Sequence, residues 1–506
     1  MFSKAEQELE WVRARVAARF PVYETKVSEQ AVQFLVNVDP ATMEAKFDDL
    51  RTELVPKDYI PVLAKQGGEY SVVVQRRPPQ RFLGPSVNLI LLIATLVTTT
   101  IAGALNWGGY DNIDWATPEA FAKGSVYFTL PLLAILGIHE MAHYLMAKRY
   151  KVHASLPFFL PAPVAPLGTF GAMISMRDPI PSRKALIDIG AAGPLFGLLA
   201  AIPITLTGLW LMTGDPRPAP PNQGGGLNVG LPILYQALAL FVPIPQDAIL
   251  HPTAFAGWVG LFVTALNLLP AGQLDGGHVA RALLGDNQRF LSYGATLFMM
   301  FLGLFFYPGW LLIAIFILVL GARHPPPLND LTRLDLKRYA LGLLTASVLV
   351  VSFAAVPLTE IERSAAVEFE QPGVPGVPVN AINVTLNLSV QAERNSAYSF
   401  LVVNSGNVRT SMNLTLDPAD LQDLRNLNIS VSFESVIVGN RSATLGNGSA
   451  TFTFDHGESA NVTLRINATD YQLGPLPWTF TVRASVQGEG VRPEQAELEF
   501  RLRFVL

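Results

Sequence analysis

The stretch PLLAILGIHEMAHYLMAKRY (Pro131–Tyr150) places two histidines and a glutamate inside an otherwise apolar segment. At 3.6 residues per turn, His139 and His143 lie one turn apart on the same face of a helix, so both imidazoles can bind one metal ion. Glu140 lies about 100° around that helix, close enough to act on a water molecule at the metal. Ionisable side chains are costly in an apolar segment that can span a bilayer, so a functional role is the default interpretation. The alternative is a His–Glu group that is hydrogen-bonded inside a helix bundle.

The composition of the whole chain indicates a membrane protein. Of its 506 residues 50% are hydrophobic and 15% are charged, which is too apolar for an ordinary soluble protein. The net charge of −4 argues against general nucleic-acid binding. Because the chain contains no Cys, disulfides, cysteine nucleophiles and Cys–zinc sites are excluded. Apolar runs predict about seven membrane spans, at 84–106, 124–147, 185–212, 252–270, 290–307, 308–322 and 340–357.

The distribution of Lys and Arg predicts the orientation of these spans. Twelve such residues lie in loops and span ends on one side, and two, Lys123 and Arg217, lie on the other. This asymmetry places the N-terminus in the cytoplasm and, with seven spans, residues 360–506 outside it. Candidate N-glycan acceptors agree with this orientation, because all N-x-[ST] sequons fall in that C-terminal part. An Asn-, Thr- and Ser-rich β domain that matches by composition is the alternative. The sequons are Asn383, Asn387, Asn413, Asn428, Asn440, Asn447, Asn461 and Asn467.

Three domains are expected along the chain. Residues 1–82 predict a small cytoplasmic α+β domain, and residues 83–359 predict an α-helical multi-pass membrane core. Residues 360–506 consist of short segments that alternate apolar and polar residues between turn signals, which is typical of an all-β sandwich. Within them, FLVVNSGNVRTSMNLTL (Phe400–Leu416) resembles immunoglobulin-like domains of prokaryotic cell-surface proteins.

A catalytic zinc site needs a third protein ligand and an open fourth position. Glu140 is the one glutamate between those at positions 119 and 360, so the third ligand of a site in the membrane region should be Asp or His. Asp275 follows an apolar run in NLLPAGQLDGG (Asn267–Gly277), at the membrane face that His143 also reaches. His278 is the nearest alternative. The other aspartates on this side are Asp178, Asp188, Asp286, Asp330 and Asp335.

The motifs HEMAH and NLLPAGQLDGG together resemble those of the site-2 protease family of intramembrane zinc metalloproteases. GTFGAMI (Gly168–Ile174) and AAGPLFG (Ala191–Gly197) resemble further segments of the same family, and the resemblance covers roughly residues 80–360. It implies a site-2 protease-like core, a transmembrane protein substrate, one catalytic Zn²⁺ bound by His139, His143 and Asp275, and Glu140 as the general base.

Two further segments are candidates for substrate binding. Asn267 matches the asparagine of the family motif, which implies a contact with the substrate backbone or the oxyanion. A hydrogen bond between helices is the alternative. The stretch GTFGAMIS alternates small and apolar residues, so as a hairpin strand it fits β-addition of an extended substrate. The alternative is a re-entrant loop that packs the bundle. The residues of this strand that would contact substrate are Gly168, Thr169, Phe170 and Gly171.

These features predict an intramembrane zinc metalloendopeptidase of the cell membrane, which cleaves transmembrane proteins within or near the bilayer. One alternative is a polytopic metal transporter or receptor with a buried zinc site. A transporter would show ionisable residues along several spans, whereas here they gather at one depth. The other alternative is an inactive homologue whose exported β domain binds a surface ligand.

Overall fold

The computed structural model describes residues 4–28, 30–78, 84–163, 167–214, 217, 227–242, 249–320, 324–360, 365, 367–371, 374–378, 384–391, 395–406, 408–468, 478–488, 491 and 494–505. The sequon residue Asn383 lies outside these residues. The chain forms two compact units. One consists of Met1–Pro218 with Gly230–Pro357, and the other of Ala219–Val229 with Leu358–Leu506. The predicted division into three domains, with boundaries after residues 82 and 359, stays a prediction.

The first unit begins with a four-stranded antiparallel sheet, in the order β1-β2-β4-β3, and two helices. Phe34, Phe47 and Leu50 lie in the apolar core between them. The strand β3 is an element that the sequence does not predict, and it contains a proline at position 61. Proline is tolerated in an edge strand, and β3 is one. The elements are α1 (Lys4–Ala17), β1 (Val22–Val27), β2 (Ala31–Val36), α2 (Met43–Leu54), β3 (Tyr59–Gln66) and β4 (Glu69–Arg76).

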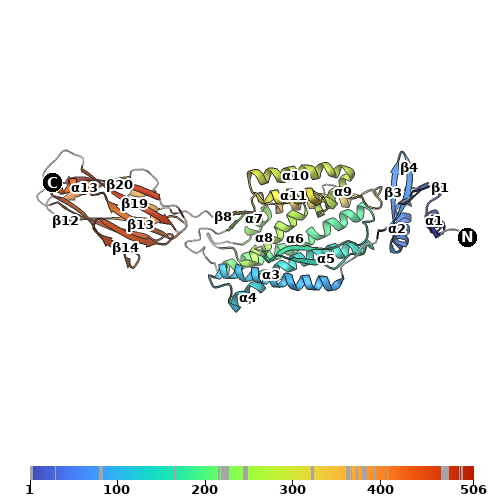
Figure 1. Cartoon of the computed structure of the whole chain (residues 1–506), viewed down its shortest axis with the longest axis horizontal. Coiled ribbons are helices and arrows are strands. Elements are labelled where there is room, and N and C mark those ends of the chain that lie inside the picture. The colour runs from blue at the N-terminus through green and yellow to red at the C-terminus, as the bar shows by residue number, and fades with distance from the viewer. Residues whose placement is uncertain are drawn as a thin grey trace. The chain divides into compact units, whose positions relative to one another are not determined.

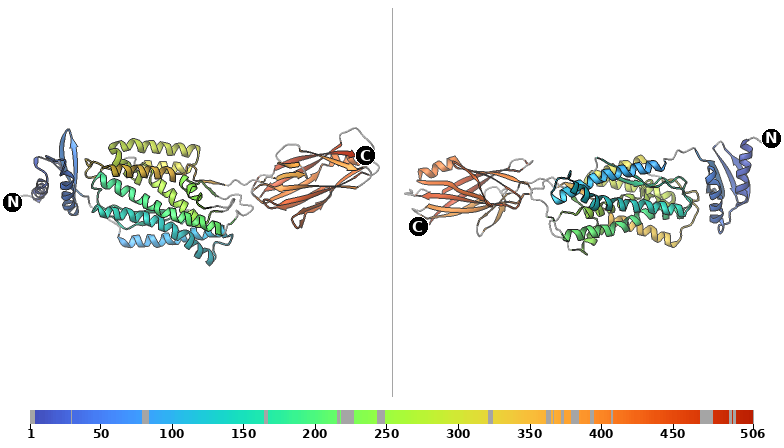
Figure 2. Two further views of the ribbon diagram at one scale, coloured as in Figure 1. Left: turned by 180° about the vertical axis from the view of Figure 1, so that it is seen from behind. Right: turned by 90° about the horizontal axis from the view of Figure 1, so that it is seen from below.

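A helical bundle follows in the same unit. Figure 1 shows α3 along one side of it and α10 along the other, with α5, α6 and α8 between, and the views in Figure 2 agree. A short π-helical segment, Ser125–Thr129, joins α4 to α5. The helices are α3 (Pro85–Asp111), α4 (Pro118–Gly124), α5 (Leu130–Arg149), α6 (Arg183–Gly214), α7 (Ile233–Ala239), α8 (Pro252–Asn267), α9 (Asp275–Leu284), α10 (Gln288–Phe305), α11 (Gly309–Leu320) and α12 (Leu336–Ser352).

Helices occupy all seven positions where the sequence predicts spans. Among the described residues, three helical stretches are long and apolar enough to cross a membrane, namely Pro85–Asp111, Pro118–Arg149 and Arg183–Gly214. The helices α8, α10, α11 and α12 have 16, 18, 12 and 17 residues. These helices support a multi-pass membrane core, whereas the number of seven spans remains a prediction.

Small residues let the central helices approach each other closely. A Cβ atom at Gly208 of α6 would lie 2.1 Å from the backbone nitrogen of Ala254 in α8. A Cβ atom at Gly257 of α8 would lie 2.3 Å from Oγ1 of Thr205 in α6. Association of helices in a bilayer depends on such close packing, because lipid is as apolar as a leucine side chain.

A two-stranded hairpin of β5 (Phe158–Pro161) and β6 (Thr169–Met173) lies against α3. The buried Asn88 of α3 donates its side-chain N–H groups to the carbonyls of Leu156 and Pro157, at 2.7 and 3.0 Å. The Thr98 hydroxyl donates to the carbonyl of Gly168 at 2.6 Å. Gly168 has a φ of 71°, and a Cβ atom there would lie 2.4 Å from the Thr98 carbonyl oxygen. The hairpin is thus held by polar groups on an otherwise apolar helix.

The sheet of the N-terminal region is fixed to the bundle at Asp178. The Arg77 guanidinium donates to this carboxylate at 2.9 Å, and the backbone N–H of His153 donates to it at 3.0 Å. Burial by itself raises the pKa of Asp178, but these donors outweigh it and hold the pKa below its ordinary value. Ionised Asp178 therefore stabilises the folded chain.

The second unit is a β structure of two six-stranded sheets, in the orders β10-β9-β12-β18-β14-β15 and β11-β20-β19-β13-β17-β16. Side chains of both sheets form one apolar core, which includes Val402, Leu414, Phe454, Leu464 and Val482. The β-rich fold is as predicted, while its immunoglobulin-like class stays a prediction. The elements are β9 (Val367–Gln371), β10 (Val374–Pro378), β11 (Val384–Gln391), β12 (Asn395–Asn404), β13 (Thr410–Leu416), α13 (Pro418–Asn426), β14 (Ile429–Val438), β15 (Arg441–Ser442), β16 (Thr444–Gly446), β17 (Ser449–Phe454), β18 (Ser459–Ala468), β19 (Trp478–Gly488) and β20 (Glu494–Val505).

Two short strands of the second unit, β7 (Leu227–Val229) and β8 (Leu358–Glu360), form an antiparallel pair. The residues just before β8 and just after β7 belong to the first unit. Hydrogen bonds from two tryptophan side chains hold them there. Trp258 of α8 donates to the Gly230 carbonyl at 2.9 Å, and Trp310 of α11 donates to the Ala355 carbonyl at 2.7 Å.

Candidate metal centre

The helix α5 carries both histidines of the HEMAH motif on one face. His139 and His143 are 4% exposed, their ring centroids are 4.9 Å apart, and their Nε2 atoms are 3.2 Å apart. The helical repeat dictates this arrangement for residues i and i+4. Two imidazole nitrogens thus point toward one position inside the bundle.

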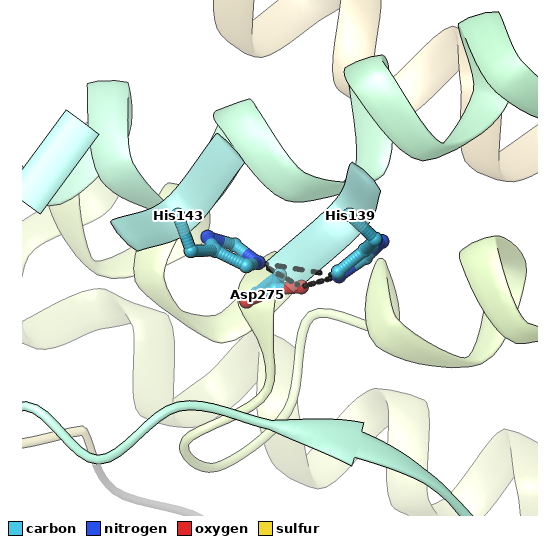
Figure 3. A group of neighbouring side chains, drawn as sticks. All are labelled: His139, His143 and Asp275. Atoms are coloured by element: carbon cyan, nitrogen blue, oxygen red, sulfur yellow. Dashed lines mark hydrogen bonds and ion pairs between the residues drawn. The ribbon is translucent and has the colours of Figure 1, made fainter. Parts of the chain in front are cut away.

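Asp275 reaches the same position from the first residue of α9. Its Oδ2 atom lies 3.2 Å from Nε2 of His139 and 3.1 Å from Nε2 of His143 (Figure 3). The glycines that follow allow α9 to fold back tightly on the end of α8. A Cβ atom at Gly276 would lie 2.0 Å from the Leu268 carbonyl oxygen, and one at Gly277 would lie 2.3 Å from the Gly272 carbonyl oxygen. The LDGG sequence therefore positions the carboxylate.

The three donor atoms form a triangle that fits a tetrahedral metal ion. Zinc bonds to nitrogen and oxygen are about 2.0–2.1 Å long, so two ligand atoms on a tetrahedron lie about 3.3–3.4 Å apart. The observed edges of 3.1, 3.2 and 3.2 Å are close to this value. His139, His143 and Asp275 are the cluster of three potential ligands found among the described residues. A triangle of three ligands leaves the fourth tetrahedral position open, which is typical of catalytic rather than structural zinc.

Neighbouring backbone groups fix the His143 ring. Its Nδ1 atom lies 2.8 Å from the Ile189 carbonyl oxygen and donates to it, which leaves the lone pair on Nε2. The ring packs so closely on α6 that a Cβ atom at Gly193 would lie 2.0 Å from Nε2 of His143. A Cβ atom at Gly197 would lie 2.9 Å from Nδ1 of His139. The two glycines of the AAGPLFG segment thus leave the space that both imidazoles occupy.

Asn267 and Glu140 also lie at this centre. Nδ2 of Asn267, at the end of α8, is 3.3 Å from Nε2 of His139. Glu140 is 7% exposed, and its carboxylate interacts with the backbone N–H of Ile174, directly after β6. The general-base candidate therefore contacts the segment that the sequence identifies as a substrate strand.

The remaining candidates lie elsewhere. His278 donates from Nδ1 to the Leu274 carbonyl at 3.0 Å, and its ring packs against that of His324 with centroids 4.5 Å apart. It is outside the cluster of three. Of the substrate-strand residues, Gly168 directly precedes β6 and the other three begin it, and the side chain of Phe170 is 76% exposed. Ile174, directly after this strand, interacts with Glu140 beside the cluster.

The residues that hold this strand and the two rings are not among the candidates predicted from the sequence. Of these, Asn88 lies in a stripe of buried polar residues on α3, with Thr95 and Thr99, whose helical spacing in an apolar helix is a detectable signal. The contacts of Ile189, Gly193 and Gly197 with the histidines join residues far apart in the sequence. No local pattern marks them.

Comparison with known proteins identifies the central part of the chain. Residues 127–308 match the family described as Peptidase family M50. The "Probable zinc metalloprotease EGY1, chloroplastic" of Arabidopsis thaliana is 31% identical over 261 residues, which are 49% of this chain and 44% of that protein. Its counterpart of the same name in Oryza sativa subsp. japonica is 33% identical over 47% of this chain and 42% of that protein. The chain thus spans less than half the length of these relatives.

A third relative extends the same pattern. The "Probable zinc metalloprotease EGY2, chloroplastic" of Arabidopsis thaliana is 26% identical over 54% of this chain and 50% of that protein. Together, the family match and these relatives confirm the resemblance that HEMAH and NLLPAGQLDGG indicate. Residues 127–308, which carry both motifs, match peptidase family M50, and the relatives similar to this part of the chain are named as zinc metalloproteases.

Proposed function

We propose that this protein is an intramembrane zinc metalloendopeptidase. The observation that carries the proposal is the triangle of donor atoms from His139, His143 and Asp275, with Glu140 beside it on the same helix. The names of the relatives support the same activity. A zinc transporter would have no need for a carboxylate that lies beside the ligands without joining them.

The donor set suits zinc. Imidazole nitrogen and carboxylate oxygen are zinc ligands, and the edges of the triangle match a tetrahedral ion of this size. The hydrogen bond from Nδ1 of His143 to the Ile189 carbonyl selects the tautomer that a ligand requires. Zinc held by these three residues would supply Lewis acidity, which activates water and polarises a scissile carbonyl.

The remaining chemistry belongs to side chains of the protein. Glu140 takes a proton from the attacking water as the general base and then returns it to the leaving amine as the general acid. Asn267 is close enough to His139 to offer its side-chain N–H to the carbonyl oxygen as negative charge develops there. Glu140 is buried, and Asn267 is partly buried, so both interactions are stronger than they would be in water.

The substrate must be extended when it is cut, because a helix hides its amide groups. Within the described residues, β6 pairs with β5 on one side only, which leaves an edge for β-addition of a transmembrane protein substrate. Gly168, Thr169, Phe170 and Gly171 form the first part of this edge. The contact from Ile174 to Glu140 would align the added strand with the general base.

The test is cleavage of a single-span substrate by the purified protein in detergent, comparing wild type with Glu140→Gln. Glu119→Gln is the matched control, because Glu119 lies in α4 at a distant part of the bundle and is paired with Lys123. We expect cleavage to be lost in Glu140→Gln while zinc stays bound, and to persist in the control. A folded wild-type protein without zinc would refute the metal site. Cleavage by Glu140→Gln at the wild-type rate would refute the assigned mechanism.

We also propose seven spans in the cell membrane, a cytoplasmic N-terminus and an extracytoplasmic C-terminal domain that carries N-glycans. The Lys and Arg distribution and the sequons support this orientation. Because the chain contains no Cys, single cysteines at Gln66 and Asn440 give clean labels. A membrane-impermeant maleimide added to intact cells should label Asn440→Cys and spare Gln66→Cys. Labelling of both or of neither would refute the orientation.

A further inference from the structure

A hollow of about 470 Å³ lies between α2 and the end of α5, the helix that carries HEMAH. Its volume is within the range of small-molecule sites. Glu44, Ala45 and Asp48 line it from α2, and Arg149 and Lys151 line it from the end of α5 and the residues after it. None of the groups of the metal centre contributes to it.

Hydrogen bonds fix the two walls relative to each other. The guanidinium of Arg51 is 2% exposed and donates from α2 to the carbonyls of Tyr150 and Lys151, at 3.2 and 3.4 Å. The Leu63 N–H of β3 donates to the Leu328 carbonyl at 2.8 Å. An arginine that caps the C-terminal carbonyls of a helix is favourable for both partners. These hydrogen bonds hold the walls of the hollow at a fixed separation.

The charges around this hollow do not balance. Glu44 is paired with Lys184 at 2.7 Å, and Asp48 is paired with Arg51 at 2.7 Å. Both acidic groups of the lining are thus already neutralised. The exposed side chains of Arg149 and Lys151 have no ion-pair partner among the residues that the structure describes. Two positive charges remain to face the hollow.

We propose that this hollow binds a phosphate group. A phosphate monoester carries about −1.5 to −2 charges near neutral pH, which matches the two free cations. Arginine and lysine are the usual partners of phosphate oxygens, and arginine binds them in a fork. The group belongs either to a lipid headgroup or to a soluble phosphate compound. Arg149 is the last residue of a candidate span, which puts the hollow at headgroup depth.

The experiment measures binding rather than cleavage, so its outcome is independent of the proposed peptidase activity. The full chain in detergent is titrated with inorganic phosphate and glycerol 3-phosphate, and in nanodiscs with phosphatidic acid against phosphatidylcholine. Binding is followed by thermal shift and native mass spectrometry. The variant Arg149→Gln/Lys151→Gln removes the two free cations. The matched control, Lys46→Gln/Lys148→Gln, removes two neighbouring cations that do not line the hollow.

We expect the double variant of the lining to weaken phosphate binding by at least about tenfold, because it removes two charge-assisted contacts. The control should bind as wild type does. A second variant, Ala45→Phe, fills the hollow without a change in charge and should block binding as well. Saturation by the soluble phosphates identifies a soluble ligand, and saturation by phosphatidic acid alone identifies a headgroup. Equal loss in the lining and control variants, unchanged binding by Ala45→Phe, or no binding of any phosphate by wild type would overturn the proposal.

Discussion

The substitution Gly193→Ala tests the geometry of the metal centre most directly. The added Cβ atom would lie 2.0 Å from Nε2, 2.4 Å from Cδ2 and 2.6 Å from Cε1 of His143. Movement of the ring is restrained, because its Nδ1 atom donates a hydrogen bond to the Ile189 carbonyl. Alanine favours a helix over glycine by about 0.5–1 kcal/mol, so loss of α6 is not the expected result.

The size of the effect follows from the distances. Ordinary contact begins near 3.4 Å, so the ring or the helix must shift by about 1.4 Å from the 2.0 Å starting distance. Metal–ligand distances tolerate only about 0.2 Å. Changes around a metal's ligands typically cost about 10–100-fold in affinity, and we expect Gly193→Ala to reach or exceed the upper limit. Gly197→Ala, with a contact of 2.9 Å to Nδ1 of His139, should cost about tenfold.

The assay is zinc per chain after dialysis against graded concentrations of a competing chelator, with a thermal melt on each sample. Gly294→Ala in α10 is the matched control, because a Cβ atom there meets nothing within 4 Å. We expect Gly294→Ala to bind zinc as tightly as wild type, Gly197→Ala to bind it less tightly, and Gly193→Ala to bind it least tightly. A Gly193→Ala protein that binds zinc as tightly as wild type would refute the placement of His143 against α6.

Four further predictions follow from the same contacts. Asn267→Ala should keep zinc but slow cleavage by about 10²–10³-fold, as expected for loss of an oxyanion donor; a lower melting temperature with unchanged cleavage would instead indicate a bond between helices. Asn88→Leu should destabilise the hairpin by about 1–3 kcal/mol and lower kcat/KM at constant zinc content, and an unchanged kcat/KM would argue against a role of the hairpin. Asp178 has a lowered pKa, so its stabilisation is complete above the unfolded value of about 3.9 and is lost as the pH falls through the folded value. Thermal melts below about pH 4 should therefore fall more steeply for wild type than for Asp178→Asn, and parallel curves would exclude this contribution. Peptide mass spectrometry should find glycan on the exposed turn residue Asn440 and none on Asn467, whose amide oxygen is buried; the reverse pattern would contradict the structure.

The features that the sequence could predict are those with a local period or an unusual local composition. The spacing of His139 and His143 is enough to bring their rings together, and the apolar runs indicate where helices lie. The absence of another suitable glutamate and the side of the membrane that it reaches favour Asp275 as the third ligand, and the structure puts its carboxylate beside both rings. Its role as a ligand remains a proposal.

The features that the sequence could not predict depend on packing between distant segments. The strand β3 contains Pro61, which is acceptable only because this strand lies at the edge of the sheet. The need for glycine at positions 193 and 197 arises from imidazoles on another helix. The four shorter helices α8, α10, α11 and α12 show why span counting is uncertain, since a helix in a bundle can be shorter than the bilayer is thick.

The pairing of β7 with β8 determines where this polypeptide can be shortened. The strand Leu227–Val229 lies between α6 and α7, and its partner Leu358–Glu360 begins the C-terminal β structure. A truncation after α12 would strip the loop strand of every backbone bond in this ladder and leave an edge that is prone to aggregation. A truncation that ends beyond Glu360 keeps the ladder closed. Preparations of the membrane core for enzymology should therefore retain these three residues, although they belong to the β domain.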